Sequence, residues 1–291
     1  MNHPSPLWPA NLDHIRLDSP EPEEMARFYR DAMGMAPTAL GDDLWLLSGP
    51  ERRLLIGRGA KNGHPYAAFR LAHGEQLEGL RRFATAKGFV PLPSPTPLLE
   101  DGAFALRDPD GRLAVFGLPR TGVEEASFAH LPAARLPGRL QHDVVATADL
   151  ERLTKFYVDG LGFLVADTVC EGEREPYGAA TARFFRADLE HHSFAAFRAP
   201  EARGDHHAYE TTCWNDIRDW LDHFGDLGIA PWWGPGRHGV GHNLFFMVKD
   251  PDGNNLELSA EIEIMPKAMP GRVWPHAMPT LNRWGVGWMR S

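Results

Sequence analysis

Two histidines and a glutamate in the second half of the chain, His142, His207 and Glu257, have side chains suited to metal chemistry. Two neutral imidazoles and one carboxylate can hold Fe(II) or Mn(II) on one face and leave about three coordination positions open for a chelating substrate and O2. The three residues are far apart in the sequence, so only the fold can bring them together. If it does, their types predict an open metal site used for oxygen chemistry.

An internal duplication supplies the elements that must position these residues. Several motifs of the first half recur in the same order in the second half: residues 12–14 (LDH) and 140–142 (LQH), 28–29 and 156–157 (FY in both), 33–35 (MGM) and 161–163 (LGF), and 108–111 and 250–253 (DPDG in both). The first three pairs share one offset along the sequence, which is unlikely by chance, and the last pair follows in the same order. The chain therefore consists of two related halves.

Each half is expected to contain two units of strand, helix and several strands, which is an α+β fold. Thr147 or Asp149 can cap the first helix of the second half, and Gly160 and Gly162 end it. Asn215 is expected to cap the second helix of that half, which Gly228 ends. The other expected elements are helices near 20–32 and 76–87, and strands near 140–146, 163–169, 180–187, 192–198, 243–249 and 255–260, with a new unit starting at His207.

We expect two domains, residues 1–125 and 126–291, joined by an Ala- and Pro-rich linker near 120–137. The tail from 262 to 291, rich in Pro and Trp, is expected to cover the pocket mouth or to pack against a second subunit.

Composition favours a small-molecule ligand over nucleic acid. The net charge is −9, and the basic residues form no cluster that would reverse this locally. The two cysteines, Cys170 and Cys213, lie far apart and suggest neither a disulfide framework nor a thiolate site. Without a leader-like N-terminus or an 18-residue apolar run, the expected location is cytoplasmic, with no membrane partner.

From about residue 10 to 262, the sequence resembles the vicinal oxygen chelate superfamily, whose unit is a βαβββ module, and within it the type I extradiol dioxygenases. The resemblance is carried by residues 236–238 (GRH), Phe245-Phe246, the stretch DPDGNNLE that ends at Glu257, and the pairs His191-His192 and His206-His207. It implies four modules in two domains, with catalysis in the second.

The resemblance also implies the roles of individual residues. The metal ligands would be His142, one member of the pair His206-His207, and Glu257; adjacent strand residues point to opposite faces, and His207 is chosen because the residues after it resemble the family pattern His-x-Ala-Phe. His192 would lie beside the O2 position, and His238 would hydrogen-bond the substrate oxygen.

Two sites depart from the family pattern. The family usually has a tyrosine ten residues before the ligand glutamate, where this chain has Met247, which cannot donate a proton. Tyr209, on the same face as His207, is an unproven substitute. In the first half His14 persists, but Tyr66 is taken as the counterpart of His207 and Val115 as that of Glu257, which predicts a metal-free N-terminal domain.

The leading hypothesis is an Fe(II)-dependent extradiol dioxygenase that cleaves a catechol-type ring with O2, with Mn(II) as a possible ion. Its partners would be a small aromatic substrate and O2, and family resemblance implies a homo-oligomer. A metal-dependent isomerase or lyase of the glyoxalase kind is the alternative, slightly favoured by Met247. A ligand-sequestering protein of the same fold is the third possibility, although such proteins usually lack a full ligand set.

Overall fold

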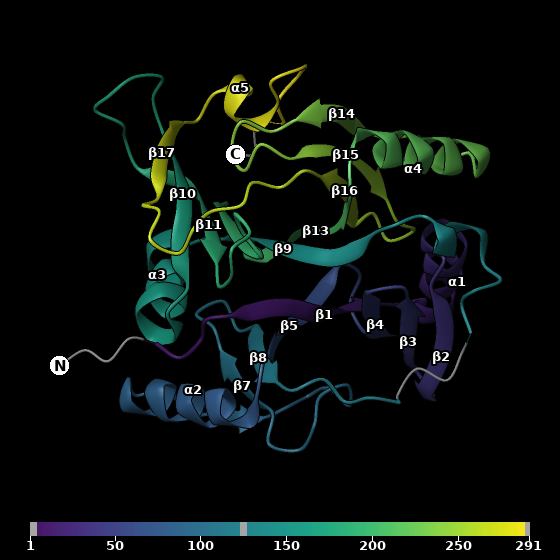
Figure 1. Cartoon of the computed structure of the whole chain (residues 1–291), viewed down its shortest axis with the longest axis horizontal. Helices are drawn as coiled ribbons and strands as arrows, with labels where there is room; N and C mark the ends of the chain where they lie inside the picture. Colours follow the sequence, from purple (N-terminus) through teal and green to yellow (C-terminus); the bar gives the residue numbers. More distant parts are fainter. Residues whose placement is uncertain (1–4, 123–126, 289–291) are drawn as a thin grey trace.

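The structure is a computed structural model that describes residues 5–122 and 127–288. Within these ranges the chain forms two mixed sheets, one of eight strands and one of nine, each with helices packed against it (Figure 1). The first sheet comes from the first half of the chain and the second sheet from the second half. This confirms the expected α+β class.

The first half contains β1 (Ala10–Ser19), α1 (Pro22–Met33), β2 (Ala36–Gly41), β3 (Leu44–Gly49), β4 (Arg52–Arg58), β5 (Gly63–Leu71), α2 (Gly74–Ala86), β6 (Leu92–Pro93), β7 (Phe104–Arg107) and β8 (Leu113–Gly117). The second half contains the 3-10 turn η1 (Pro132–Arg135), β9 (Arg139–Thr147), α3 (Leu150–Lys155), the π-helical turn η2 (Phe156–Leu161), β10 (Leu164–Cys170), β11 (Ala180–Arg186), β12 (Phe194–Arg198), β13 (Arg203–Thr211), α4 (Trp214–Asp226), β14 (Trp233–Arg237), β15 (Leu244–Lys249), β16 (Asn255–Ala260), β17 (Arg272–Pro275) and α5 (Met278–Leu281).

Both sheets are built on the same plan of paired βαβββ modules. Their strand orders are β2-β3-β4-β1-β5-β8-β7-β6 and β14-β15-β16-β13-β9-β12-β11-β10-β17. At the centre of each sheet the first strands of its two modules pair antiparallel, β1 with β5 and β9 with β13. The last strand of each module then pairs parallel with its own first strand. The second sheet has one addition, β17, which pairs parallel with β10.

Local sequence explains where the helices of the second half begin and end. The Asp149 side chain accepts a hydrogen bond from the Arg152 amide and starts α3, as expected, and Gly162 ends the following turn with φ at 94°. The cap of α4 is Cys213 rather than Asn215, so that expectation was wrong. Asp216 decides the start, because its carboxylate accepts from the backbone N–H of Cys213.

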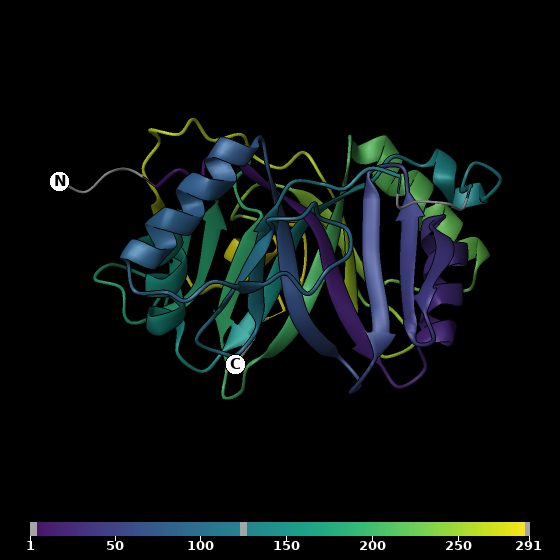
Figure 2. The same ribbon diagram turned by 90° about the horizontal axis from the view of Figure 1, so that it is seen from below.

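Helices of the two halves meet at both ends of the molecule. Figures 1 and 2 show α2 beside α3 at one end and α1 beside α4 at the other, with the sheets between them. Phe89 contacts Phe156 edge-on with ring centres 5.2 Å apart, and Phe69 contacts Phe163 at 5.4 Å. The apolar core is therefore continuous between the halves.

A buried arginine fixes the segment that leads into the second sheet. Arg52 of β4 donates from Nε to the Gly138 carbonyl at 2.7 Å and from Nη1 to the Ala133 carbonyl at 3.2 Å. Its guanidinium also lies over the Trp220 ring of α4, 5.0 Å from the centre. Burial lowers the pKa of Arg52 to about 10, so the side chain keeps its charge at neutral pH.

The Phe-Tyr motif of each half contacts the DPDG turn of the other half. The hydroxyl of Tyr29, from the first Phe-Tyr motif, donates to Asp250 of the second DPDG turn at 3.1 Å. Tyr157, from the second Phe-Tyr motif, reaches Asp108 of the first DPDG turn at 3.5 Å. Each repeated tyrosine thus contacts the repeated turn of the other half.

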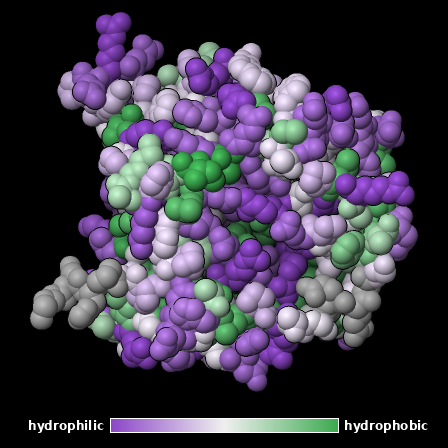
Figure 3. Space-filling view, in the orientation of Figure 1, coloured by the Kyte–Doolittle hydropathy of each residue, from purple (hydrophilic) through white to green (hydrophobic). Residues whose placement is uncertain are grey.

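Polar side chains cover most of the face seen in Figure 3, and apolar side chains form separate patches there. Across the described ranges, no helix has the length and apolar character needed to cross a membrane.

We expect Tyr29→Phe to lower the free energy of unfolding by roughly 1–3 kcal/mol, because it leaves the buried Asp250 carboxylate without one of its donors. Tyr157→Phe is the matched control from the duplicate motif and should cost less, since its contact is longer. Urea unfolding midpoints measure both, and equal losses would contradict the assignment.

Candidate metal centre

Three neighbouring strands set one row of side chains across the second sheet. Ala208 of β13 lies opposite His142 of β9 on one side and opposite Glu257 of β16 on the other. Adjacent strands are about 4.8 Å apart, and the methyl group of Ala208 fills little of the space above the sheet. The imidazole and the carboxylate can therefore converge over Ala208. His206 lies two residues before Ala208, on the same face.

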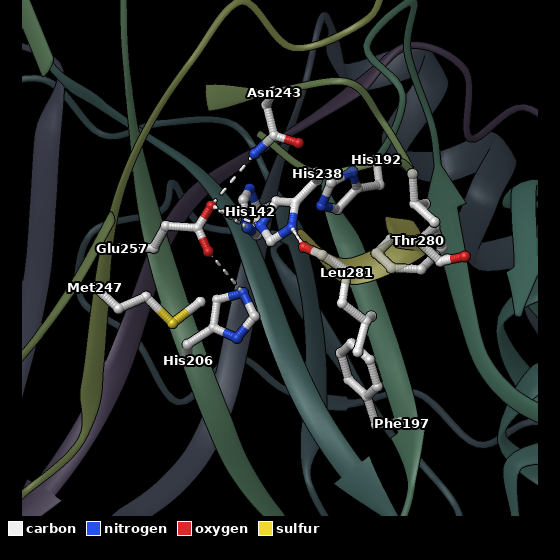
Figure 4. A pocket seen from close by; sticks show the side chains of 12 residues that line it. His142, His192, Phe197, His206, His238, Asn243, Met247, Glu257, Thr280 and Leu281 are labelled. Carbon is white, nitrogen blue, oxygen red and sulfur yellow. Dashed lines mark hydrogen bonds and ion pairs between the residues drawn. The ribbon is translucent and has the colours of Figure 1, made fainter. Parts of the chain in front are cut away.

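The three side chains meet at distances suited to a shared cation. Nε2 of His142 lies 4.0 Å from Oε1 of Glu257, and Nε2 of His206 lies 3.4 Å from Oε2 (Figure 4). All three groups are buried, and their potential ligand atoms lie within 4.8 Å of one another. Within residues 5–122 and 127–288, no other trio of His, Cys, Asp or Glu meets this spacing. Two imidazoles and a carboxylate form a donor set that Fe(II) and Mn(II) accept.

A β-bulge precedes each histidine of the cluster. Along the β9–β13 ladder the paired positions skip Gln141 and Asp205, each directly before its histidine. A bulge changes the direction of the side chain at the bulged residue, so the side-chain oxygens of Gln141 and Asp205 reach the rings of the histidines that follow them. Oε1 of Gln141 lies 2.5 Å from Nδ1 of His142, and Oδ1 of Asp205 lies 2.7 Å from Nδ1 of His206.

These acceptors select the tautomer of each ring. An oxygen acceptor at Nδ1 requires a proton on that nitrogen, which leaves the lone pair on Nε2, the atom that faces Glu257. Burial, followed by the neighbouring histidines His206 and His238, holds the pKa of His142 well below its ordinary value. His142 is therefore a neutral imidazole at physiological pH, which is the form that binds metals.

The structure places His207 away from this cluster, so the expectation that it is a ligand was wrong. Its Nε2 lies 3.1 Å from the Tyr29 hydroxyl, on the face of β13 that packs against the first half. Because the hydroxyl donates to Asp250, it accepts a hydrogen bond from Nε2–H of His207. Burial lowers the pKa of His207 to about 3.

Two sequence signals could have identified His206. In the pattern His-x-Ala, the histidine two residues before Ala208 is His206, and an acidic acceptor, Asp205, directly precedes it. The first half shows the same register: Ala68 lies opposite His14 as Ala208 lies opposite His142. Tyr66, two residues before Ala68, is thus the counterpart of His206 rather than of His207.

The expectation for Tyr209 was affected by the same error, the assumption that the face of β13 that carries His207 meets the cluster. Its hydroxyl points to the sulfur of Met35 at 4.0 Å, and its ring lies in the apolar core shared by the two halves. Tyr209 was expected on the same face as His207, and it is, but that face is opposite to the cluster. It therefore cannot replace the family tyrosine, and the expectation of a catalytic role was wrong.

The other expected residues do line the pocket that opens at the cluster. This pocket is lined by His142, Phe184, His192, Phe197, His206, His238, Val240, Asn243, Met247, Glu257, Thr280 and Leu281. His192 lies beside His142 with ring centres 4.4 Å apart. The His238 ring stacks on Phe245 at 3.8 Å, with Nε2 3.9 Å from Oε1 of Glu257. Asn243 donates a hydrogen bond to that oxygen, at 3.3 Å.

The tail contributes to the pocket wall, which agrees with the first of its two expected roles. Thr280 and Leu281 line the pocket, and the Leu281 carbonyl hydrogen-bonds Nδ1 of His238. Further along, Trp288 packs edge-on against Trp232 with ring centres 4.8 Å apart. Residues 289–291 of the tail lie outside the described residues.

The N-terminal counterpart of the cluster has different chemistry. The equivalent positions hold His14, Tyr66 and Val115, which offer one imidazole and no carboxylate. Both ring nitrogens of His14 are hydrogen-bonded, Nδ1 to Asp13 at 2.6 Å and Nε2 to Thr96 at 2.7 Å. A metal-free first half stays a prediction, to be checked by metal stoichiometry.

Comparison with known proteins finds a family model that matches the second half. Residues 139–258 match the model of the Glyoxalase/Bleomycin resistance protein/Dioxygenase superfamily. The chain is 29% identical to "Metapyrocatechase 2" of Cupriavidus necator over 300 residues, which cover 94% of this chain and 88% of that protein.

Solved structures of similar fold extend over almost the whole chain. Homoprotocatechuate 2,3-dioxygenase from Arthrobacter globiformis matches with a TM-score of 0.78 and 20% identity, covering 98% of this chain and 90% of that one. A Mn(II)-bound glyoxalase from Novosphingobium aromaticivorans matches with a TM-score of 0.75 and 22% identity, covering 95% and 91%. At this identity the likeness shows a shared fold.

We expect His206→Ala to abolish stoichiometric metal binding and the adjacent substitution His207→Ala to retain it, because only the first removes a side chain of the candidate ligand cluster. Asp205→Ala should lower the affinity by about 10–100-fold, the usual effect of losing the partner that orients a ligand histidine. Metal analysis and calorimetric titration of the three proteins give the result. Metal retained by His206→Ala would overturn the ligand set.

Proposed function

We propose that this protein is a metal-dependent extradiol dioxygenase that cleaves a catechol-type aromatic ring with O2. The observation that carries the proposal is the cluster of His142, His206 and Glu257 at the base of a pocket that His192 and His238 also line. The similarity to a metapyrocatechase over nearly the full length supports the same reaction class.

We propose Fe(II) as the ion, with Mn(II) as the alternative that the same donors accept. His142 and His206 would bind through Nε2, and Glu257 through its carboxylate. When bound, the ion supplies neighbouring coordination positions for the two substrate oxygens and O2. The protein holds the two imidazoles in the required tautomer before any ion arrives, because Gln141 and Asp205 fix their Nδ1 protons.

We propose that two further histidines handle protons. Nδ1 of His238 hydrogen-bonds the Leu281 carbonyl, which only accepts, so this nitrogen carries a proton. In the neutral ring, Nε2 of His238 then has a lone pair near the cluster and can accept a hydrogen bond from a substrate hydroxyl. His192 lies on the other side of His142, where we propose that it serves the O2 position.

The pocket walls favour a neutral substrate with an apolar substituent. Phe184, Phe197, Val240, Met247 and Leu281 supply apolar surface, and among residues 5–122 and 127–288 no Lys or Arg lines the pocket. A carboxylate on the substrate would lose its hydration in this pocket without gaining a cationic partner there, which is unfavourable. Met247 adds apolar surface at the position where the family usually offers a hydroxyl.

The reaction is tested by loading the protein with Fe(II) without oxygen, adding a catechol, and then admitting O2. We expect O2 uptake with a yellow ring-fission product, and no turnover by His206→Ala. His207→Ala is the matched control that keeps the ligand set. Absence of product from every substituted catechol, with stoichiometric Fe(II) bound, would contradict the proposal.

Among catechols, we expect kcat/KM for alkyl- or aryl-substituted substrates to exceed that for carboxylated ones by at least about tenfold, because an unpaired buried carboxylate costs more than ~1.4 kcal/mol. Initial rates across a matched series of both kinds measure the ratio. Equal or reversed preference would show that the apolar walls do not set specificity.

Met247 favours a second candidate, a glyoxalase-like isomerase or lyase in which the ion stabilises an enediolate. Such chemistry needs no O2 and no tyrosine hydroxyl at that position. Activity with Zn(II), Ni(II) or Mg(II) in the absence of O2 uptake would support it over ring cleavage. The expected homo-oligomer and cytoplasmic location stay predictions.

A further inference from the structure

Behind His192, a chain of buried groups leads away from the pocket. Nδ1 of His192 lies 2.9 Å from Nδ1 of the adjacent His191, and Nε2 of His191 lies 2.9 Å from Oδ2 of Asp167 on β10. Both rings and the carboxylate are buried. His191 thus stands between a pocket histidine and a buried carboxylate, bonded to each through a different ring nitrogen.

The Asp167 carboxylate is held by the added strand β17. Arg272 donates to it from Nε at 2.8 Å and from Nη2 at 3.0 Å, and the Trp274 indole N–H donates at 2.8 Å. Burial opposes ionisation, but the hydrogen bonds from His191 and Arg272 hold the pKa of Asp167 below its ordinary value. Asp167 is therefore a carboxylate that only accepts hydrogen bonds.

The Asp167 carboxylate determines which nitrogen carries the proton, first in His191 and then in His192. His191 must carry a proton on Nε2 to donate to Asp167, so in the neutral ring its Nδ1 has a lone pair. The Nδ1 atom of His192 faces that lone pair at 2.9 Å and must therefore be the donor. The opposite tautomer of His192 would place two lone pairs against each other, which is repulsive.

We propose that Asp167 and His191 are positioning residues that fix His192 as the Nδ1–H tautomer, with an unprotonated Nε2 available to the pocket. His192 can then accept a proton or a hydrogen bond at Nε2 without first changing tautomer. The catalytic consequence rests on the proposed dioxygenase function, whereas the tautomer itself does not. The same contacts give β17 a function: it places Arg272 and Trp274 on Asp167.

The tautomer can be read directly by NMR on the full chain, labelled with 15N-histidine and loaded with diamagnetic Zn(II), with His192 assigned by its loss in His192→Gln. We expect a protonated Nδ1 and an unprotonated Nε2 at His192. His191→Phe keeps a ring against Phe184 but removes the acceptor, and should shift His192 toward the Nε2–H tautomer. A wild-type His192 protonated on Nε2, or an unchanged signal in His191→Phe, would overturn the proposal.

Kinetics give a second reading with matched variants. His191→Phe should lower kcat by at least about tenfold, because a positioned proton-transfer group contributes about 10²–10⁴-fold and this variant leaves the group present but misdirected, with little change in catechol KM or metal content. His191→Asn offers an oxygen acceptor near the Nδ1 position and should restore both the wild-type tautomer and most of kcat. Glu210→Gln, which neutralises another buried carboxyl group unconnected to His192, should change neither.

If the unaltered protein cleaves no catechol, the NMR result still decides the tautomer, so the two proposals can fail separately. If it does cleave catechol, the His191→Phe variant separates the two roles of His191. A rise in catechol KM and a fall in metal content as large as the fall in kcat would show that His191 is merely structural, and would overturn its positioning role.

Discussion

The arrangement of the candidate metal centre depends on short-range hydrogen bonds that orient imidazole rings before any ligand is present. For both candidate ligand histidines an acceptor in the preceding residue, Gln141 or Asp205, accepts a hydrogen bond from Nδ1–H. The β-bulge makes this possible, because in a regular strand adjacent side chains point to opposite faces. A sheet with perfect register would lack either the acceptor or the ligand.

The sequence could predict most of the fold, because the duplicated motifs and the helix and strand periodicity determine it locally. His142 and Glu257 were also predictable, the latter because buried Leu256 and Leu258 alternate around it. Strand alternation alone could not decide between His206 and His207, because it places one of them on each face; the decision required the His-x-Ala spacing to Ala208 and the acidic residue Asp205 before His206. Strand β17 was missed because its short, proline-bounded sequence carries no alternation and forms a strand only by pairing with β10.

The two halves show how little separates a candidate metal centre from a filled core. The first half keeps the bulge at Asp13 and the imidazole of His14 that Asp13 orients. Tyr66 stands at the position of His206, and Val115 at that of Glu257. Both side chains belong to a separate apolar cluster of the first half. The Thr96 hydroxyl hydrogen-bonds Nε2 of His14, the atom that would otherwise face a cation. The same backbone can therefore hold a donor set or a packed interior, depending on two side chains.

The adjacent pair His206-His207 links the candidate centre to the contact between the halves. One ring faces Glu257, and the next faces Tyr29, whose hydroxyl also reaches Asp250. Because the two histidines share one strand, the position of β13 is set from both faces: by the ligand cluster on one side and by the first half on the other. The first half is then more than a remnant of duplication, since it supplies the surface against which the strand that carries His206 is held.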